Sequence, residues 1–285
     1  MSVRVGFVGA GGVARAHMDN LRELADVAVV AVSDVRLERA RQAAGPWSAA
    51  ACSDCVQMLD REHLDAVYVC VPPAEHGSLE IELAELGIPF YVVGMPAAAW
   101  WRRKELSGGQ VVEQSTHVYD LLRYLAGEVE TVSAFASTGA MTDVEGFDVE
   151  DASVAALDFS GGAVGHVVSS CVLKEGGEPQ VALRFDGRGY TLKLTAESIE
   201  LAAAEDRRSE SFPPPPGGWM VRADRAFIEA VRRGDPSGIR SDYTDSLRTL
   251  ALTLAVNRSF ETAERVSPAE VLLAASHGCC ADAGQ

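Results

Sequence analysis

Six residues near the amino end of the chain have the types and spacing of a phosphate-binding turn. Gly9, Gly11 and Ala14 form a G-x-G-x-x-A pattern that follows the β-branched apolar run Val3 to Val8 and opens an amphipathic stretch. The glycines permit a tight turn and a close approach of the backbone to a pyrophosphate, and the alanine lets the following helix pack closely on the strand. We therefore predict that a dinucleotide binds at the turn formed by Gly9, Ala10, Gly11, Gly12 and Val13.

An acidic residue further along the chain indicates which dinucleotide is bound. The apolar run Ala28 to Val32 predicts a second strand, and Asp34 follows it, 20 residues after Ala14. At that spacing a carboxylate can accept hydrogen bonds from the hydroxyl groups of the adenine ribose, which favours NAD over NADP. Arg36 could pair with the 2′-phosphate of NADP instead, or it could be a solvated residue of the turn, and the sequence leaves both interpretations open.

The strands that position this turn belong to a doubly wound parallel sheet. Strand and helix patterns alternate from Ser2 to Pro96, which is typical of such a sheet, and its ligands bind beyond the carboxyl ends of the strands. We therefore expect cofactor contacts from Val71, Pro72, Pro73 and His76, and from Met95 after the next strand. The two prolines could stiffen the loop under a nicotinamide, or they could only terminate the strand.

Composition and charge limit the class of protein. A chain of 285 residues with 47% apolar content can bury a substantial core and suggests two domains. The net charge of −16 argues against nucleic acid and anionic membrane surfaces as partners, since both require clustered Lys and Arg. The chain opens without a basic segment or a long apolar stretch, so we expect no signal peptide, no spanning helix and a cytoplasmic location.

The six cysteines do not indicate a redox or metal centre. Cys52 and Cys55 have the C-x-x-C spacing, but such a role needs a second ligand pair or an electropositive setting, and the sequence shows neither. Ser53 is expected instead to cap the helix that begins near Asp54. The sequence therefore predicts no metal site and no disulfide framework.

Taken in order, these residues and three later motifs resemble the Gfo/Idh/MocA family of glucose–fructose oxidoreductase and inositol dehydrogenase. The later motifs are Trp101-Arg102, Ser107-Gly108-Gly109 and the segment from Glu113 to Asp120. The resemblance implies a Rossmann domain followed by an α+β domain with an open, mainly antiparallel sheet. It also implies an NAD-dependent oxidoreductase whose small-molecule substrate is a sugar or a cyclic polyol.

The resemblance also implies which residues carry the chemistry. His117 would be the acid/base group, Glu113 would lie one helical turn before it on the same face, and Asp120 would help to hold the imidazole. A histidine suits this role because its pKa lies near the operating pH, although it could also be a satisfied residue packed between helix and sheet. Trp101 and Arg102 would contact the cofactor or substrate, or would form a Trp–Arg stack on the surface.

One departure from the family pattern bears on function. The family usually ends its fourth strand in Glu-Lys-Pro, where the lysine donates a proton to the substrate, whereas this chain has Gly94-Met95-Pro96. A thioether cannot donate a proton, and the loss of a general acid costs about 100- to 10,000-fold in rate. A second function therefore stays open, that of a non-redox lyase or isomerase or a catalytically silent binding protein.

A second departure concerns length. Only four strands are predicted before Ser107-Gly108-Gly109, whereas a dinucleotide sheet has about six. Either residues are missing between Pro96 and Arg102, or the protein has a true internal deletion. We place a dinucleotide-binding domain at residues 1–98 and a substrate-binding and oligomerisation domain at residues 99–285.

The second domain is predicted to be an antiparallel sheet with closing helices. Period-2 patterns separated by glycine-rich turns indicate its strands, which we place at 131–137, 152–159, 164–173, 180–185 and 190–194. Helices follow at 221–232 and 243–264, and the small-residue tail that contains Cys279-Cys280 is expected to be loose. A broad apolar sheet face calls for a partner surface, so we predict a homo-oligomer that forms through this sheet.

Overall fold

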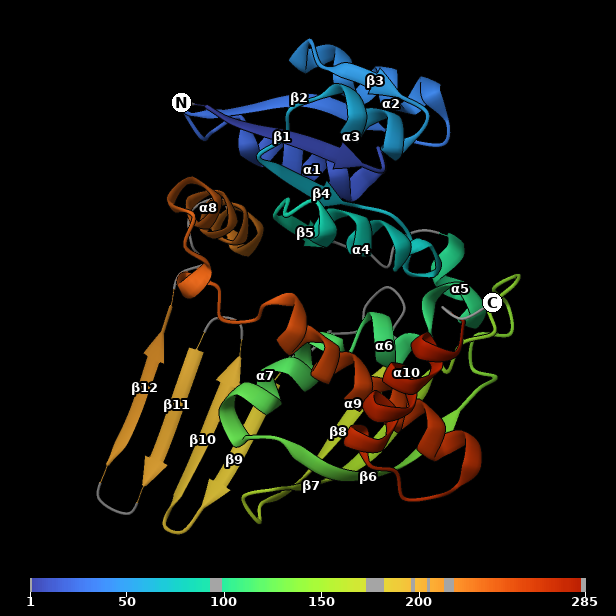
Figure 1. Cartoon of the computed structure of the whole chain (residues 1–285). Helices are drawn as coiled ribbons and strands as arrows, with labels where there is room; N and C mark the ends of the chain where they lie inside the picture. The colour runs from blue at the N-terminus through green and yellow to red at the C-terminus, as the bar shows by residue number, and fades with distance from the viewer. Residues whose placement is uncertain are drawn as a thin grey trace.

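The computed structural model describes residues 2–92, 99–172, 182–195, 198–203, 206–212 and 218–282 of the chain. A parallel sheet with flanking helices forms the amino-terminal part, and two antiparallel sheets, of which β6-β7-β8 packs against helices, form most of the remainder (Figure 1). One late helix, α8, returns to the first part.

The described part of the amino-terminal domain contains a five-stranded parallel sheet in the order β3-β2-β1-β4-β5. Its strands are β1 (Val3–Val8), β2 (Val27–Ser33), β3 (Ala50–Cys52), β4 (Ala66–Val69) and β5 (Phe90–Val92). The central strands β1 and β4 are rich in β-branched residues and almost wholly buried, as expected for a sheet covered on both faces. The predicted doubly wound sheet is therefore confirmed, with β3 as a short edge strand that its three-residue pattern could not reveal.

Helices connect these strands. They are α1 (Gly12–Leu21), α2 (Leu37–Ala44), α3 (Cys55–Arg61) and α4 (Ser78–Glu85), with 3-10 turns η1 (Gly45–Trp47) and η2 (Pro73–Glu75). The expected cap at Ser53 is wrong, because Asp54 is the N-cap and accepts a hydrogen bond of 2.9 Å from Val56 N. Burial raises the pKa of the Cys52 and Cys55 thiols, which disfavours the reactive thiolate.

Four short helical segments lead into the second domain, and a three-stranded antiparallel sheet follows them. The helical segments are η3 (Ala99–Arg102), α5 (Lys104–Ser107), α6 (Gln110–Glu113) and α7 (Thr116–Ala126), and the strands are β6 (Val129–Ser137), β7 (Ala152–Phe159) and β8 (Val164–Ser170). One face of this sheet packs against α7, α9 (Tyr243–Thr262) and α10 (Pro268–Asp282) in a common apolar core. The tail that was expected to be loose is thus helical, since Pro268 suits the first helical turn and the alanines that follow favour a helix.

A second antiparallel sheet is separate from the first among the described residues. Its strands are β9 (Ala182–Gly187), β10 (Tyr190–Thr195), β11 (Ser198–Ala203) and β12 (Arg207–Ser211), in the order β12-β11-β10-β9. The expected single open sheet is therefore divided in two. Strands β11 and β12 were not predicted. Strand β12 is exposed throughout, and its sequence RRSES carries no apolar alternation.

Helix α8 (Gly218–Arg233) joins the carboxyl-terminal half of the chain to the amino-terminal sheet. Ile228 is part of the same buried cluster as β1 and α1, and Phe227 stacks on Tyr91 of β5 at 5.4 Å. At the centre of this contact, Asp224 is fully buried. The division of the chain at residue 98 stays a prediction, and the packing of α8 shows that the two halves share a core.

The buried Asp224 carboxylate accepts three hydrogen bonds from the amino-terminal domain. Oδ1 contacts His17 Nδ1 at 2.6 Å and accepts from the Tyr68 hydroxyl at 3.1 Å, and Oδ2 accepts from Asn20 Nδ2 at 2.8 Å. Burial and the nearby Asp224 raise the pKa of Tyr68, so its hydroxyl stays a proton donor. A charged group without water needs such partners, and the arrangement fixes α8 against α1 and β4.

Candidate functional site

The glycine-rich turn after β1 has the shape of a phosphate cradle. Gly9 has a φ of +93°, and a Cβ there would lie 2.4 Å from the carbonyl oxygen of Cys70, so only glycine fits. A Cβ on Gly11 or Gly12, by contrast, would meet nothing within 4 Å. Gly11 is the N-cap of α1, and no side chain caps that end. Free backbone N–H groups beside open space are what a pyrophosphate requires, so these residues fit a dinucleotide.

This difference between the glycines gives a first testable prediction. Gly11→Val should fold normally, since the backbone at Gly11 is extended and the space is open. It should weaken NAD binding on the order of 100-fold, because the branched side chain fills the space that the phosphates need. Calorimetric titration with NAD and thermal unfolding together check this.

Gly9→Ala is the matched variant, and it should lower the melting temperature because of the clash with Cys70. Wild-type affinity for NAD in a folded Gly11→Val protein would contradict the assignment of this turn to the cofactor.

Asp34 ties the turn after β1 to the turn after β2. Its Oδ2 accepts a hydrogen bond of 2.9 Å from Ala10 N, and its Oδ1 accepts one of 2.9 Å from Arg36 N. Each carboxylate oxygen keeps a second lone pair that can accept from a ribose hydroxyl. The Arg36 side chain is exposed, so the structure leaves its contact with a 2′-phosphate a prediction.

The loop after β4 carries a paired histidine. Val71, Pro72 and Pro73 are half-buried and lead through η2 to His76, whose Nδ1 is hydrogen-bonded to Oε1 of Glu80. Glu80 is buried, and its Oε2 accepts a hydrogen bond of 2.7 Å from Gly77 N. Burial by itself would raise the pKa of Glu80, but the bonds from His76 and Gly77 outweigh it and lower that pKa. Glu80 was not predicted as a site residue, although its i,i+4 spacing from His76 indicates a side-chain pair.

The Ser107-Gly108-Gly109 motif positions α6. Gly109 has a φ of +98°, and a Cβ there would lie 2.7 Å from the carboxylate oxygens of Glu150. The buried Glu150 in turn accepts a hydrogen bond of 2.8 Å from Val111 N at the start of α6. Gly108 is held from the other side, because its carbonyl accepts a hydrogen bond of 2.6 Å from Asn257 of α9. The motif therefore places the end of α6, where Glu113 lies.

The predicted relation between Glu113 and His117 is wrong in one respect. Glu113 ends α6 and α7 begins at Thr116, so the two residues do not share one continuous helical face. Burial raises the pKa of Glu113 to about 7, and the positive charge of His76 opposes that rise. A half-buried carboxyl group with this pKa can accept or donate a proton near neutral pH.

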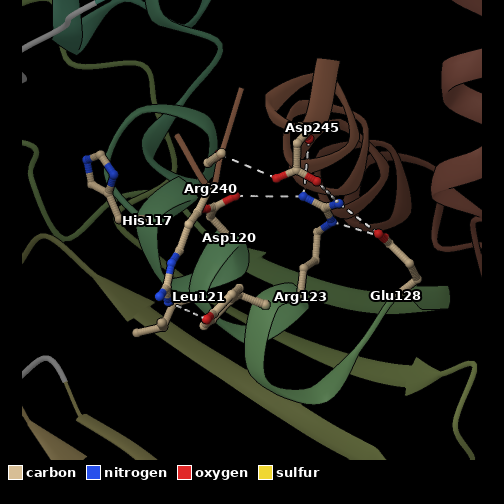
Figure 2. A pocket seen from close by; sticks show the side chains of 9 residues that line it. His117, Asp120, Leu121, Arg123, Glu128, Arg240 and Asp245 are labelled. Carbon is tan, nitrogen blue, oxygen red and sulfur yellow. Dashed lines mark hydrogen bonds and ion pairs between the residues drawn. The ribbon is translucent and has the colours of Figure 1, made fainter. Parts of the chain in front are cut away.

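His117 lies in the first turn of α7 on the wall of a cavity of about 470 Å³ (Figure 2). The other residues that line it are Asp120, Leu121, Arg123, Tyr124, Glu128, Arg240, Ser241 and Asp245. The His117 side chain is exposed, which excludes the interpretation of a satisfied core histidine. Arg240 donates a hydrogen bond of 2.6 Å to the Tyr124 hydroxyl at the same cavity.

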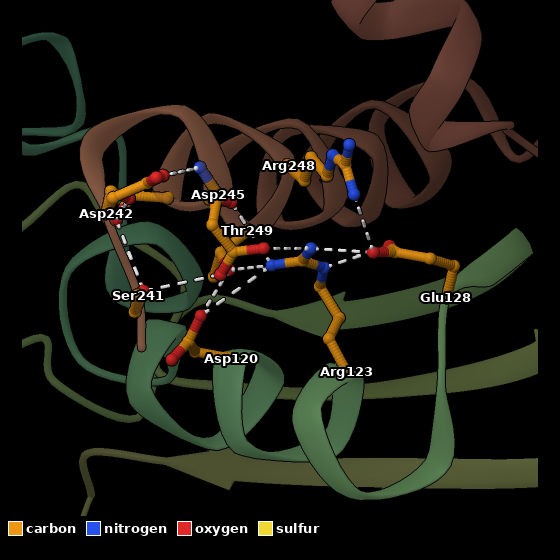
Figure 3. A network of polar contacts seen from close by, with 9 residues as sticks. Asp120, Arg123, Glu128, Ser241, Asp242, Asp245, Arg248 and Thr249 are labelled. Atoms are coloured by element: carbon orange, nitrogen blue, oxygen red, sulfur yellow. Dashed lines mark hydrogen bonds and ion pairs between the residues drawn. The ribbon is translucent and has the colours of Figure 1, made fainter. Parts of the chain in front are cut away.

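A network around Arg123 forms the back of this cavity (Figure 3). The Arg123 guanidinium bonds to Glu128 at 2.8 and 3.0 Å, to Asp245 at 3.0 Å and to Thr249 at 2.7 Å. Asp120 accepts a hydrogen bond of 2.6 Å from Thr249 and lies 3.7 Å from the Arg123 guanidinium, so it holds α7 to α9. Among the residues that the structure describes, the expected contact of Asp120 with the His117 imidazole is not seen. The network fixes α7 against α9, and the pairing of these two distant segments was not predicted from the sequence.

One of the two interpretations of the Trp101-Arg102 motif was a stack of the two side chains on the surface. The structure does not show this stack. The Trp101 ring lies edge-on to Phe147 with centroids 6.0 Å apart, and its Nε1 is buried without a hydrogen-bond partner among the described residues. Arg102 is exposed. Their contact with a cofactor or substrate stays a prediction, and Met95 lies outside the described residues.

Lysine is scarce throughout the sequence. Lys104, Lys174 and Lys193 are its three lysines, and residues 1–98 contain none. Lys104 is paired with Glu261 at 2.7 Å and lies over the ring of Phe260. Lys193 belongs to β10, and Lys174 lies outside the described ranges. Among the described residues, Glu113 and the histidines are therefore better placed than a lysine to exchange protons at this site.

The parallel sheet with its glycine cradle, followed by helix-covered antiparallel sheets, defines a two-domain nicotinamide-dependent dehydrogenase fold. Two family models match the chain, "Oxidoreductase family, NAD-binding Rossmann fold" over residues 3–99 and "GFO/IDH/MocA C-terminal domain" over residues 84–191. The chain belongs to the Gfo/Idh/MocA family of NAD-binding oxidoreductases. The resemblance drawn from the sequence and the prediction of an NAD cofactor are thereby confirmed.

The chain is also similar to individual proteins from bacteria and yeast. The chain is 22% identical to Myo-inositol 2-dehydrogenase of Thermotoga maritima, with 95% of this chain and 100% of that protein covered. It is 24% identical to D-apiose dehydrogenase of Paraburkholderia graminis, with 87% and 85% covered. An uncharacterised protein of Schizosaccharomyces pombe is 27% identical, but this chain covers only 44% of its length. The Thermotoga alignment runs over 346 positions, so that enzyme contains segments that this 285-residue chain lacks.

Solved structures share the fold. Levoglucosan dehydrogenase in complex with NADH superposes with a TM-score of 0.80 at 17% identity, with 94% of this chain and 99% of that chain covered. The WlbA dehydrogenase from Bordetella pertussis, in complex with NADH and UDP-GlcNAcA, gives 0.72 at 21% identity over the same shares. The helices of the described residues are all too short or too polar to cross a membrane.

Proposed function

We propose that this protein is an NAD-dependent oxidoreductase that acts on a hydroxyl or carbonyl group of a sugar-like or cyclic polyol substrate. Family membership supports the reaction class, and relatives named for myo-inositol and D-apiose support the substrate class. The observation that carries the proposal is the glycine cradle at Gly9 to Gly12, where only glycine fits at position 9 and the space at Gly11 and Gly12 is open. Half-buried Glu113, whose pKa burial raises to about 7, can exchange a proton near neutral pH.

The cradle residues Gly9 to Gly12 would hold the pyrophosphate, and Asp34 would hold the adenine ribose. Bound NAD supplies the acceptor for a hydride from the substrate carbon. Glu113 accepts the proton of the substrate hydroxyl, and His117 orients the substrate from the wall of the cavity. The cavity suits a polyhydroxylated ligand because carboxylates, arginines and hydroxyl groups line it together.

Two measurements test this function. Titration of the purified protein with NAD and with NADP should show uptake with preference for NAD, since Asp34 stands at the end of β2. Incubation with myo-inositol, D-apiose or levoglucosan should then produce reduced nicotinamide, detected by its ultraviolet absorbance. Absence of nucleotide uptake by the intact protein would overturn the proposal.

The scarcity of lysine favours a second candidate. Without the usual lysine donor the protein could bind NAD and a polyol and yet catalyse a non-redox reaction or none. The two candidates differ in one measurement, namely the transfer of deuterium from a labelled substrate to the nicotinamide. Uptake of NAD without any such transfer would favour the second candidate.

The predicted homo-oligomer would form through the outer face of the β6-β7-β8 sheet. Phe135, Val154 and Val168 are aligned across the three strands on that face, and the phenylalanine side chain is 73% exposed. Phe135→Lys should therefore shift the protein to a monomer, as measured by light scattering, because a charge cannot be buried in an apolar interface. A wild-type protein that is already monomeric would contradict this prediction. The cytoplasmic location also stays a prediction.

A further inference from the structure

The helix that carries Glu113 depends on other segments for its position. Helix α6 has four residues, and a helix of that length is not stable without outside contacts. The N–H groups of its first turn lack partners within the helix, as at any helix start. Gly109 is the N-cap, and it has no side chain that could accept a hydrogen bond from them. The place of Glu113 is therefore set by groups that come from elsewhere in the chain.

Glu150 supplies the cap that Gly109 lacks. Its Oε1 accepts a hydrogen bond of 2.8 Å from Val111 N in the first turn of α6. A Cβ at position 109 would lie 2.7 Å from both carboxylate oxygens, so the carboxylate occupies the space that a capping side chain would need. Glycine at the cap and a carboxylate from a distant segment thus act together to start this helix.

The segment before β7 brings Glu150 to α6 through contacts that run in order. Phe147 lies edge-on to Trp101 with ring centroids 6.0 Å apart, and Asp148 accepts a hydrogen bond of 3.0 Å from Arg103 Nε. Glu150 comes next and meets the start of α6. The contacts follow the same order along both segments, so the neighbours of Glu150 define where its side chain arrives.

The Glu150 carboxylate is itself held firmly. Its side chain is 1% exposed, and Lys104 Nζ lies 3.9 Å from its second oxygen. A buried charge is costly to move away from its partners. Beyond the other end of α6 the contacts are neutral, since Ser115 Oγ accepts from Gln110 Nε2 at 3.1 Å and donates to Ser169 Oγ at 2.7 Å. The buried charge at the start of the helix is thus the stronger constraint on its position.

We propose that Glu150 is the positioning residue for Glu113, and that it fixes α6 where the Glu113 carboxyl group can accept the substrate proton. This inference rests on the function proposed above, in which Glu113 is that acceptor. Glu150 acts only through α6. Loss of its bond to Val111 N would let the helix shift and water reach Glu113, and a displacement of about 1 Å can cost on the order of 100-fold in rate.

The groups that act on the two carboxylates are known for the described residues. Burial raises the pKa of Glu113, and the charge of His76 opposes that rise. Lys104 of α5 is paired with Glu150, and burial followed by the charge of Glu150 raises the pKa of Tyr119 in α7, so this phenol stays neutral during the test. Because burial is the main influence on Glu113, a change in the position of α6 should alter its titration.

Two substitutions separate the position of the Glu150 side chain from its charge. Glu150→Gln keeps the length and an oxygen that can accept from Val111 N, but it removes the charge. Glu150→Asp keeps the charge but is shorter by one methylene group, so its oxygens should fall short of that N–H. Glu145→Asp, on an exposed side chain of the same loop, is the matched control.

The test combines a titration with kinetics. Carbon-13 spectra of labelled glutamate should show Glu113 titrating near 7 in the wild type, in Glu150→Gln and in the control. In Glu150→Asp the midpoint should be about one pH unit lower, because water reaches the carboxyl group. In that variant kcat for polyol oxidation should fall on the order of 10- to 100-fold. Its affinity for NAD should stay unchanged, because the cradle lies in the first domain.

The outcomes separate the positioning role from the function on which it rests. The role is overturned if Glu150→Gln lowers the Glu113 midpoint as much as Glu150→Asp does, if neither variant moves it, or if the midpoint moves while kcat keeps its wild-type value. If Glu150→Asp alone lowers the midpoint but even the wild type oxidises no polyol, the positioning of Glu113 is supported and the proposed reaction is wrong.

Discussion

Replacement of Glu113 by glutamine is expected to lower kcat for polyol oxidation by about 100- to 10,000-fold. Glutamine has nearly the same shape but cannot accept the substrate proton, so binding of NAD should be unaffected. Steady-state kinetics and a nucleotide titration on the same preparation check both statements. A variant with wild-type kcat would show that another group exchanges the proton.

The same substitution should stabilise the protein at alkaline pH. The pKa of Glu113 is raised to about 7 in the folded protein by burial, whereas the unfolded chain has the ordinary value near 4.5. The folded state therefore holds this proton more tightly, and the stability it contributes is complete below the unfolded pKa and is lost as the pH rises through about 7. Glutamine stays neutral and avoids that loss.

We expect the free energies of unfolding of Glu113→Gln and wild type to be similar below pH 4.5, and the variant to be more stable by about 1 kcal/mol at alkaline pH. This figure is smaller than the full pKa shift implies, because Glu113 is partly exposed and solvent screens its charge. Denaturant unfolding at several pH values measures the difference. Glu130→Gln, an exposed carboxylate on β6, should show no such trend.

Asp224→Ala is expected to destabilise the protein by about 3 to 5 kcal/mol. The substitution leaves His17, Asn20 and Tyr68 without their buried acceptor, and each then bears a desolvation cost. The melting temperature should fall on the order of 10 °C. Helix α8 should also become more accessible to proteases, because this carboxylate fixes it to α1 and β4.

Arg225→Ala is the matched control for this prediction. It lies on the exposed face of α8 next to Asp224, and its loss should change stability by less than about 0.5 kcal/mol. Equal melting temperatures of Asp224→Ala and Arg225→Ala would show that the buried network contributes little. The melting temperature of Asp224→Asn should lie between those of Asp224→Ala and Arg225→Ala, since an amide keeps one acceptor oxygen but loses the charge.

The amino-terminal sheet was predictable because its information is local. The apolar runs of β1 and β4, the glycines between β1 and α1, and the carboxylate of Asp34 each lie within a short stretch of chain. Gly9 belongs to this local pattern, although the atom that a Cβ there would meet, the Cys70 carbonyl oxygen, comes from the chain after β4. The antiparallel half was predicted less well, because strands such as β12 carry no apolar alternation and depend on their neighbours.

The candidate site shows the same division. His117 could be selected from its sequence motif, and its place on a cavity wall agrees with that choice. The influence of the His76 charge on Glu113 could not be predicted, because the two residues lie 37 positions apart in the chain. The role of Glu150 was hidden for the same reason, since it explains Gly109 only when the two segments are folded together.

The sequence by itself determined the cofactor class, the doubly wound sheet and the identity of the motif histidine, because these depend on residue types at fixed local spacing. Tertiary structure alone decided which carboxylates are buried and which groups face them. Burial and the arrival of distant side chains set the pKa of Glu113 and the hydrogen bonds of Asp224, and neither quantity has a local signature in the chain.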